Sequence, residues 1–190
     1  MEALKKAILD EGRVIGTHIL KVDSFLNHCI DPHLMQKIGN RFAELFAGEG
    51  ITKIVTIESS GIAPAVFTGL ALGVPVIFAK KTESNNLDPD TYRASVHSFT
   101  RGVEYVIRIN RRFITEDDTI LFLDDFLAKG QALLGLIQIA NDAGARIAGA
   151  GIVIEKGFQD GGRLVRETGI RVESLAIVEK MDPDSITFRE

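Results

Sequence analysis

The chemically most informative stretch of the sequence is ILFLDDFLAKGQA, residues 120–132, where an apolar run ends in two adjacent carboxylates. Asp124 and Asp125 are followed by a short apolar step and a turn that contains Gly130. A parallel strand delivers such residues to the sheet edge where open α/β folds bind ligands, and the next helix presents unpaired backbone N–H groups there. These N–H groups belong to Ala128, Lys129, Gly130, Gln131 and Ala132. The pattern predicts a sugar-phosphate site, with the carboxylates on hydroxyls or a hard cation.

Each part of this stretch also has an ordinary structural explanation. Acids at the end of a strand are commonly solvated, and a glycine often begins a helix without binding a ligand. Their combination directly after an apolar strand favours a site. The sequence has neither a Walker A motif nor GxGxxG, so it lacks the fingerprints of ATP hydrolysis and of dinucleotide binding.

Two strand–helix–strand units are expected to position these residues. Their elements are strands at 53–58 and 74–80 around a helix at 62–72, and strands at 119–125 and 145–156 around a helix near 129–141. Nearly continuous runs of Val, Ile, Leu and Phe are typical of strands buried on both faces. The predicted fold class is therefore α/β, a central parallel sheet flanked by helices.

The remaining segments are less regular. We expect helices at 2–11, 32–47 and near 161–168, a strand at 171–181, and irregular strand and loop between the first two helices. Asp31 and Pro32 suit the N-cap and first turn of the second helix. Residues 81–102 form a long polar segment, which we expect to be a flexible functional loop; a disordered insertion is the alternative.

Composition sets the broad class of the protein. A chain of 190 residues with 45% hydrophobic residues suits a single domain. The net charge of −4 argues against general binding of nucleic acid or anionic membrane. Cys29 has no partner for an intrachain disulfide, and the N-terminus lacks an apolar signal core, so a cytoplasmic location is expected.

Two other features could mislead. The charge-free run between Glu58 and Lys80 is long enough to span a bilayer. Prolines and glycines divide it into a short helix, a turn and a strand, so we expect buried elements there instead. The four histidines show no metal-ligand spacing and are predicted to be surface or turn residues, with His28 close to Asn27.

Residues 120–132 resemble the 5-phosphoribosyl 1-pyrophosphate (PRPP) motif of type I phosphoribosyltransferases: a hydrophobic run, an acidic pair and a phosphate loop of small residues. Ala128 and Ala132 take places where many members carry hydroxyl residues, which leaves phosphate binding mainly to the backbone. IESSGIAPA resembles the family's pyrophosphate loop, FAKK its basic element and SFTRG the tip of its flexible loop. The residues thereby implied for pyrophosphate are Ser59, Ser60, Gly61, Lys80, Lys81 and Arg101.

The stretch LKVDSFLNHCIDPHLM together with IEKGF is similar to bacterial xanthine phosphoribosyltransferases, and this likeness extends over nearly the whole chain. It implies a purine site. Leu20 would offer an apolar edge and Asn27 would donate to the 2-oxo group. Lys156 would donate to the 6-oxo group and reject the amine of adenine, and Phe158 would stack on the base.

The resemblance implies conversion of xanthine and PRPP to xanthosine 5′-monophosphate (XMP) and pyrophosphate, with Asp124 and Asp125 as catalytic residues. It implies Mg²⁺ brought with PRPP, for which these two acids are candidate ligands, and no dedicated protein cage. It also implies a homodimer and a small hood from residues 1–30 and 156–170.

Two alternatives stay open: guanine, hypoxanthine or adenine as the base, or a PRPP-sensing regulator without turnover. No separate DNA-binding domain fits in 190 residues, and no basic face is evident, which counts against the regulator.

Overall fold

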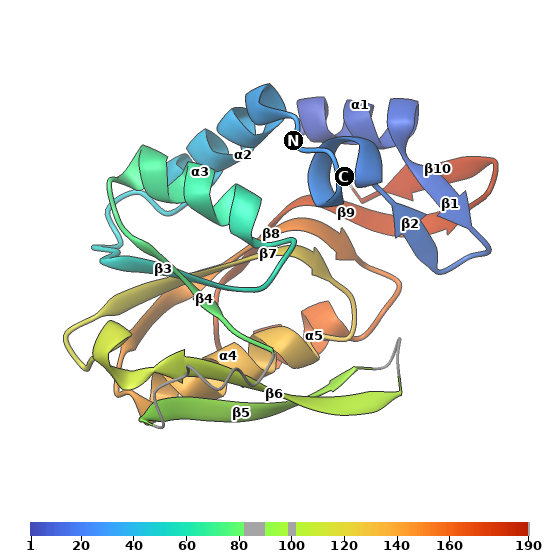
Figure 1. Cartoon of the computed structure of the whole chain (residues 1–190). Helices are drawn as coiled ribbons and strands as arrows, with labels where there is room; N and C mark the ends of the chain where they lie inside the picture. Colours follow the sequence, from blue (N-terminus) through green and yellow to red (C-terminus); the bar gives the residue numbers. More distant parts are fainter. Residues whose placement is uncertain (82–89, 99–101, 190) are drawn as a thin grey trace.

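The computed structural model describes residues 1–81, 90–98 and 102–189. Its centre is a six-stranded sheet of order β10-β9-β8-β7-β3-β4 (Figure 1). The strands are β3 (Lys53–Ile57), β4 (Val76–Ala79), β7 (Thr119–Leu127), β8 (Arg146–Lys156), β9 (Val172–Asp182) and β10 (Ser185–Phe188). All neighbours pair in parallel except β10, which is antiparallel to β9. The predicted α/β class with a parallel sheet is confirmed.

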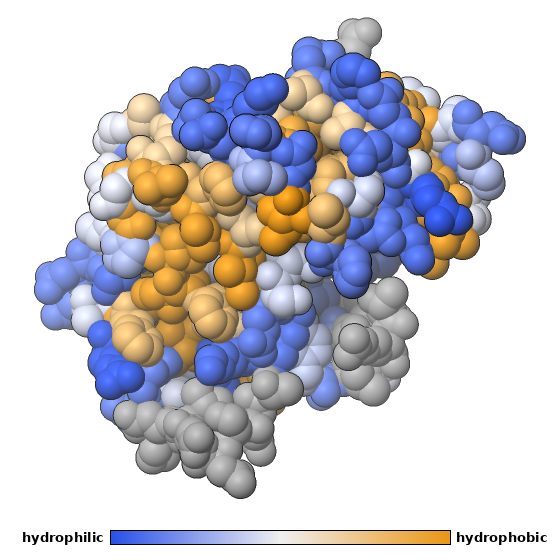
Figure 2. Space-filling model, turned by 45° about the horizontal axis from the view of Figure 1, so that its top comes forward, coloured by the Kyte–Doolittle hydropathy of each residue, from blue (hydrophilic) through white to orange (hydrophobic). Residues whose placement is uncertain are grey.

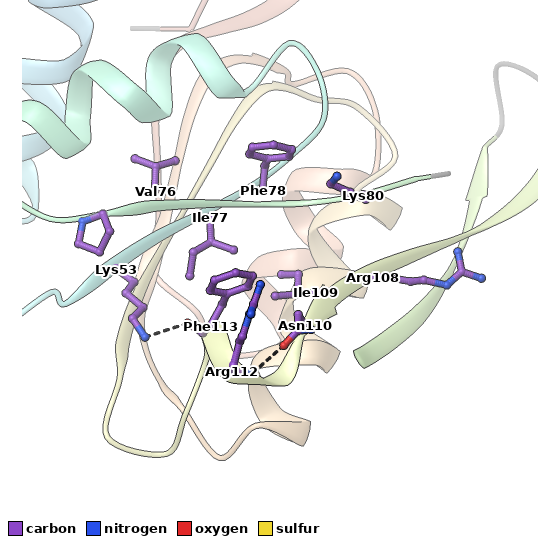
Figure 3. A pocket seen from close by; sticks show the side chains of 11 residues that line it. Lys53, Val76, Ile77, Phe78, Lys80, Arg108, Ile109, Asn110, Arg112 and Phe113 are labelled. Atoms are coloured by element: carbon purple, nitrogen blue, oxygen red, sulfur yellow. Dashed lines mark hydrogen bonds between the residues drawn. The ribbon is translucent and has the colours of Figure 1, made fainter. Parts of the chain in front are cut away.

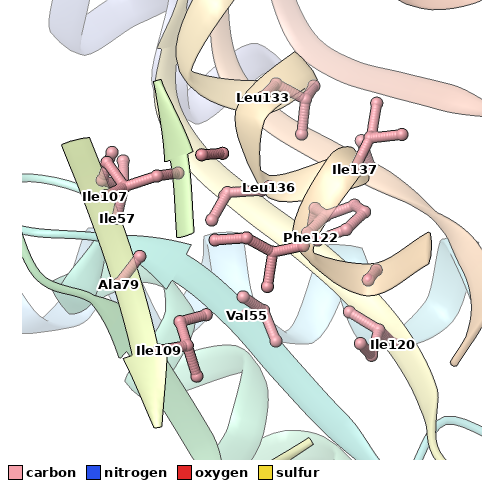
Figure 4. Close-up of a cluster of buried hydrophobic side chains, with 14 of the residues drawn as sticks. Val55, Ile57, Ala79, Ile107, Ile109, Ile120, Phe122, Leu133, Leu136 and Ile137 are labelled. Atoms are coloured by element: carbon pink, nitrogen blue, oxygen red, sulfur yellow. The ribbon is translucent and has the colours of Figure 1, made fainter. Parts of the chain in front are cut away.

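Helices cover both faces of this sheet (Figure 1). One face carries α1 (Glu2–Glu11), α2 (Pro32–Leu45) and α3 (Ile62–Leu72), and the other carries α4 (Gln131–Asp142) and α5 (Gly161–Glu167). Successive side chains of a strand point to opposite faces of the sheet, so apolar strands need helices on both faces to bury them. Ile54 and Leu121 pack with the first group of helices, whereas Val55 and Phe122 pack against α4 (Figure 4).

The N-terminal helices match their predicted positions closely. The Asp31 side chain accepts hydrogen bonds from the backbone N–H groups of His33 and Leu34, at 2.8 and 3.2 Å, and so caps α2. Between α1 and α2 lie the short strands β1 (Arg13–Ile15) and β2 (Ile19–Lys21), then a π-helical turn, η1 (Asp23–Asn27). This turn brings the N-terminal segment toward the end of β7.

The long polar segment is more ordered than the sequence suggested. Its residues 91–98 form strand β5 (Thr91–Ser98), which pairs antiparallel with β6 (Val103–Asn110). Tyr92, Ala94 and Val96 alternate along β5 and are buried in the cluster that includes α4. The prediction of one continuous loop over 81–102 is wrong for this strand, because its period-two apolar pattern lies among polar residues. Residues 82–89 and 99–101, including Arg101, lie outside the described residues.

The C-terminal part of the predicted hood also lies elsewhere. The hood was expected to combine residues 156–170 with the N-terminal segment. Lys156 does contact that segment, but α5 packs beside α4 on the opposite face of the sheet (Figure 1). The reason is Val165, a buried side chain of α5 that belongs to the cluster around α4.

The charge-free run becomes α3 and β4, both part of the folded core. Across the described ranges, no helix has the length and apolarity that a membrane crossing requires.

Candidate active site

The site is built where β7 and β3 end side by side. These strands are parallel neighbours, so the loop that follows β3 lies next to Asp124. A methyl group placed on Gly61 would lie 2.2 Å from Thr56 Oγ1 and 3.1 Å from Asp124 Oδ1. Only a glycine therefore lets this loop approach so closely. The predicted pyrophosphate loop, Ser59, Ser60 and Gly61, and the predicted acidic pair are thus brought together, and the Glu58–Ser59 peptide in this loop is cis.

The two carboxylates occupy different environments. Asp124 is 7% exposed, while Asp125 is partly exposed. Asp124 Oδ1 accepts a hydrogen bond from the backbone N–H of Asp125 at 2.9 Å. Burial, and then the like charge of Asp125, raise the pKa of Asp124 well above its ordinary value, and Lys81 opposes this only weakly. The pair is therefore a place where a cation or hydroxyl donors would relieve unfavourable negative charge.

The phosphate loop follows directly. Gly130 adopts a left-handed conformation with φ of +76°, and α4 begins at Gln131. The amides of the first turn of a helix have no partners within the helix, so they face the loop region. A hollow of about 170 Å³ is lined by Asp124 and by the loop residues Ala128, Lys129, Gly130, Gln131 and Ala132.

His97 and Tyr105 of the β5–β6 hairpin line the same hollow. Neither was predicted as a site residue, and His97 is half-buried there rather than a surface or turn residue. The alternating pattern of residues 91–98 could have revealed the strand and so a hairpin beside this hollow. It does not single out His97, which is out of phase with the residues buried against α4.

The residues predicted to recognise the base surround the other side of the acidic pair. Asn27 Nδ2 donates to Asp125 Oδ2 at 3.1 Å. Lys156 Nζ donates to the backbone carbonyl of His18 at 2.6 Å, and burial lowers the pKa of Lys156. The rings of His18 and Phe158 have centroids 6.2 Å apart. Three of the four predicted residues thus lie where the N-terminal segment meets the ends of β7 and β8.

Leu20, the fourth, is buried in the cluster formed with α1 and α2. Its packing there accounts for an apolar residue at this position whether or not a base touches it.

The two adjacent lysines point to different places. Lys81 lies on the site side: its backbone N–H donates to Glu58 Oε1 at 2.6 Å, and its ammonium is 5.6 Å from the Tyr105 ring centroid. Lys80 lines a separate cavity of about 640 Å³, together with Arg108 and Phe113 (Figure 3). Alternation along an extended chain explains the separation, because neighbouring side chains point to opposite sides.

Solved structures define the fold. The fold superimposes on adenine phosphoribosyltransferase from Rhodothermus marinus with a TM-score of 0.76 at 19% identity, covering 94% of this chain and 100% of that one. The enzyme from Giardia lamblia complexed with 9-deazaadenine gives a TM-score of 0.76 at 20% identity, with coverages of 92% and 96%. The fold is that of the type I phosphoribosyltransferases.

Curated relatives define the family more closely. The chain is 55% identical to xanthine phosphoribosyltransferase from Oceanobacillus iheyensis over 190 residues, which cover 100% of this chain and 98% of that protein. It is 57% identical over 188 residues to the corresponding protein of Bacillus cereus, with coverages of 99% and 95%. No protein-family model matches the chain. The chain belongs to the xanthine phosphoribosyltransferase family.

Proposed function

We propose that this protein transfers the phosphoribosyl group of PRPP to N9 of xanthine, giving XMP and pyrophosphate. Full-length similarity to xanthine phosphoribosyltransferases supports the substrate pair. The observation that carries the chemistry is the paired carboxylate at the end of β7, which lies between the phosphate loop and Asn27.

In this proposal the backbone of residues 128–132 binds the 5′-phosphate, and Asp124 and Asp125 bind the ribose hydroxyls. Ser59, Ser60, Gly61 and Lys81 face the pyrophosphate. The lone pair of N9 forms the bond to C1′ while the bond from C1′ to the pyrophosphate oxygen breaks, and the proton of the base is released to solvent. The carboxylates stabilise positive charge that develops on the ribose ring, and no protein nucleophile is required.

The acidic pair also suits a hard cation, because carboxylate oxygens are preferred ligands of Mg²⁺. Within the described parts of the chain, no three or more His, Cys, Asp or Glu residues gather into a metal site. In this proposal Asp124 and Asp125 would supply part of the coordination and PRPP oxygens would supply the rest. When bound, Mg²⁺ neutralises charge on the departing pyrophosphate.

Base selection is assigned to the contact between the N-terminal segment and β8. Lys156 is half-buried and charged, so it can donate to an oxo group but cannot accept from an amine. Asn27 can donate to the 2-oxo group by which xanthine differs from hypoxanthine. Exchange of its hydrogen bond with Asp125 for one with the base would couple base binding to the acidic pair.

A homodimer is part of the proposal. Figure 2 shows an apolar area on the face that carries α3 and β4. Its large exposed apolar residues are Val66, Leu70, Phe78 and Phe113. Leu70 is 76% exposed, and the cavity that holds Lys80 adjoins this area. A second copy of the chain would cover this surface, and Leu70→Glu should then convert a dimer to a monomer in light scattering. A monomeric wild-type protein would contradict this part.

The activity is tested by offering xanthine, guanine, hypoxanthine, adenine and orotate separately with PRPP and Mg²⁺, and identifying the nucleotide formed. We expect XMP as the main product. Preferential conversion of guanine would overturn the assignment of Asn27, and no product from any base would favour a sensor.

A further inference from the structure

Helix α5 packs directly on the phosphate loop. The backbone N–H of Gly161 donates to the carbonyl of Ala128 at 3.0 Å. A methyl group on Gly161 would lie 2.4 Å from that oxygen and 2.6 Å from the nitrogen of Gly130, and one on Gly130 would lie 3.1 Å from Gly161 Cα. Backbone therefore meets backbone without intervening side chains, and the shape of the loop depends on where α5 lies.

An ion pair beneath α5 holds that position. Glu155 at the end of β8 is 2% exposed, and its two carboxylate oxygens accept from both terminal nitrogens of Arg166 at 2.8 Å each. Ser174 of β9 also donates to Glu155. Burial would raise the pKa of Glu155, but the hydrogen bonds from Arg166 and Ser174 outweigh it and the pKa is lowered. The carboxylate is thus held ionised between three elements.

The first turn of α5 lies on this carboxylate. A methyl group on Gly162 would lie 2.1 Å from Glu155 Oε1 and 2.6 Å from a terminal nitrogen of Arg166. A two-point guanidinium–carboxylate pair fixes orientation as well as distance. The pair therefore fixes the distance of α5 from β8 and its rotation about the helix axis. This position of α5 keeps Gly161 in contact with the phosphate loop.

We infer that Glu155 and Arg166 are positioning residues for the 5′-phosphate subsite, acting through α5 and Gly161 on the loop at 128–130. The inference rests on the proposed function, since it assigns that loop to the PRPP phosphate. It predicts that the main effect falls on the phosphate end of PRPP, because Asn27 and the pyrophosphate loop lie on other elements. Lys156 follows Glu155 on β8, but its side chain donates to the carbonyl of His18, away from Arg166.

Arg163 provides a matched control on the same helix. It is exposed and pairs with Glu167 at 2.7 Å and Asp160 at 3.7 Å, both in the same helical segment. Arg163→Met therefore removes the same charge from α5 without removing a link to β8.

Arg166→Met should raise the KM for PRPP about 10-fold, since small misplacements of a binding element have effects of this order or larger. The KM for xanthine should stay unchanged. The Kd of ribose 5-phosphate, measured by calorimetry without a base, should rise by the same factor, whereas inhibition by pyrophosphate should not change. Arg166→Lys should recover only part of the loss, because an ammonium cannot bind the carboxylate at two points.

Equal Kd values for ribose 5-phosphate in Arg166→Met and Arg163→Met would overturn the inference. So would an equal weakening of xanthine, pyrophosphate and ribose 5-phosphate, which indicates general loosening. If Arg166→Met does not fold, Ser174→Ala removes one donor to Glu155 and should give a smaller change of the same pattern; no change there also overturns it. A wild-type protein that binds ribose 5-phosphate but forms no XMP would contradict only the proposed function.

Discussion

The two ends of β7 carry carboxylates with the same low solvent exposure and yet opposite character. Asp118, just before the strand, and Asp124, near its end, are each 7% exposed. Asp118 accepts from Lys53 Nζ at 2.7 Å, Thr52 Oγ1 at 2.9 Å and the N–H of Thr115 at 2.8 Å. Asp124 has the N–H of Asp125 beside it, and the charge of that same residue.

Their pKa values move in opposite directions as a result. For Asp118, burial raises the pKa, but the hydrogen bonds, led by that from Lys53, outweigh it and the pKa is lowered. For Asp124, burial and the charge of Asp125 both raise it. A carboxylate with low solvent exposure thus stabilises the fold where cationic and hydrogen-bonding partners surround it. At Asp124, which lies deeper in the protein, burial and a like charge dominate, and the group is available to bind a ligand.

The largest difference between the two ends should appear in turnover. Asp125→Asn should lower kcat by about 10²–10³-fold, the range for loss of one electrostatic contact to a transition state. The KM for xanthine should change little, because the charge acts mainly on the developing ribosyl cation.

Asp118→Asn is the control for this experiment and should keep the wild-type kcat. Steady-state kinetics of the two variants make the comparison, and similar losses of kcat in both would remove the carboxylates from the mechanism.

Substitution of Asp118, and not of the acidic pair, should lower the stability of the fold. Asp118→Ala leaves the donors of Lys53, Thr52 and Thr115 without their common acceptor, so the free energy of unfolding should fall by about 2 kcal/mol. Urea denaturation measures this loss. An unchanged midpoint would show that the ion pair at this end of β7 contributes nothing to the fold.

Asp124→Asn should raise the Tm of the ligand-free protein at neutral pH. The substitution keeps an acceptor for the N–H of Asp125 and removes a carboxyl group whose ionised form the fold disfavours. Thermal unfolding without PRPP tests this, with Asp118→Asn as the variant that should shift the Tm downward. A lower Tm for Asp124→Asn would mean that its charge has a stabilising partner.

The smallest expected effects lie in the pH dependence. Asp118 has a lowered folded-state pKa, so its stabilisation is present above the ordinary value of 3.8 and is lost as the pH falls through the folded-state pKa. Asp124 has a raised one, so its protonated form supports the fold below 3.8, and this support is lost as the pH rises through the folded-state pKa.

Unfolding free energies of the wild type and the two Asn variants, measured from acid to neutral pH, therefore should diverge in opposite senses. The difference in unfolding free energy between the wild type and Asp118→Asn should disappear at acid pH. The higher unfolding free energy of Asp124→Asn relative to the wild type should also disappear at acid pH. Curves that stay parallel would contradict both assignments.

Local patterns were predictable from the sequence, and partners distant along the chain were not. The strand, acidic pair and glycine of residues 120–132 are contiguous, so their arrangement follows from strand and helix geometry alone. The bounds of α3, Ile62–Leu72, match the prediction because Gly61 and Gly73 flank an apolar helix. Strand β5 was missed because three apolar residues alternate within a polar segment.

The pairing of Lys53 with Asp118 joins residues 65 positions apart, and only the register of β3 against β7 brings them together. Glu155 and Arg166 are only 11 positions apart, but the turn between β8 and α5 decides whether they meet. The side chains of Lys80 and Lys81 point in different directions although the residues are adjacent. A sequence does not locate the end of a strand to within one residue, so it could not show which lysine faces the site.

The most direct test of the account is a crystal structure of the protein with PRPP and Mg²⁺. We predict the 5′-phosphate within hydrogen-bonding distance of the backbone N–H groups of residues 128–132, and the ribose hydroxyls on Asp124 and Asp125. PRPP bound in another cavity, or held at this loop with both carboxylates turned away from the ribose, would contradict it.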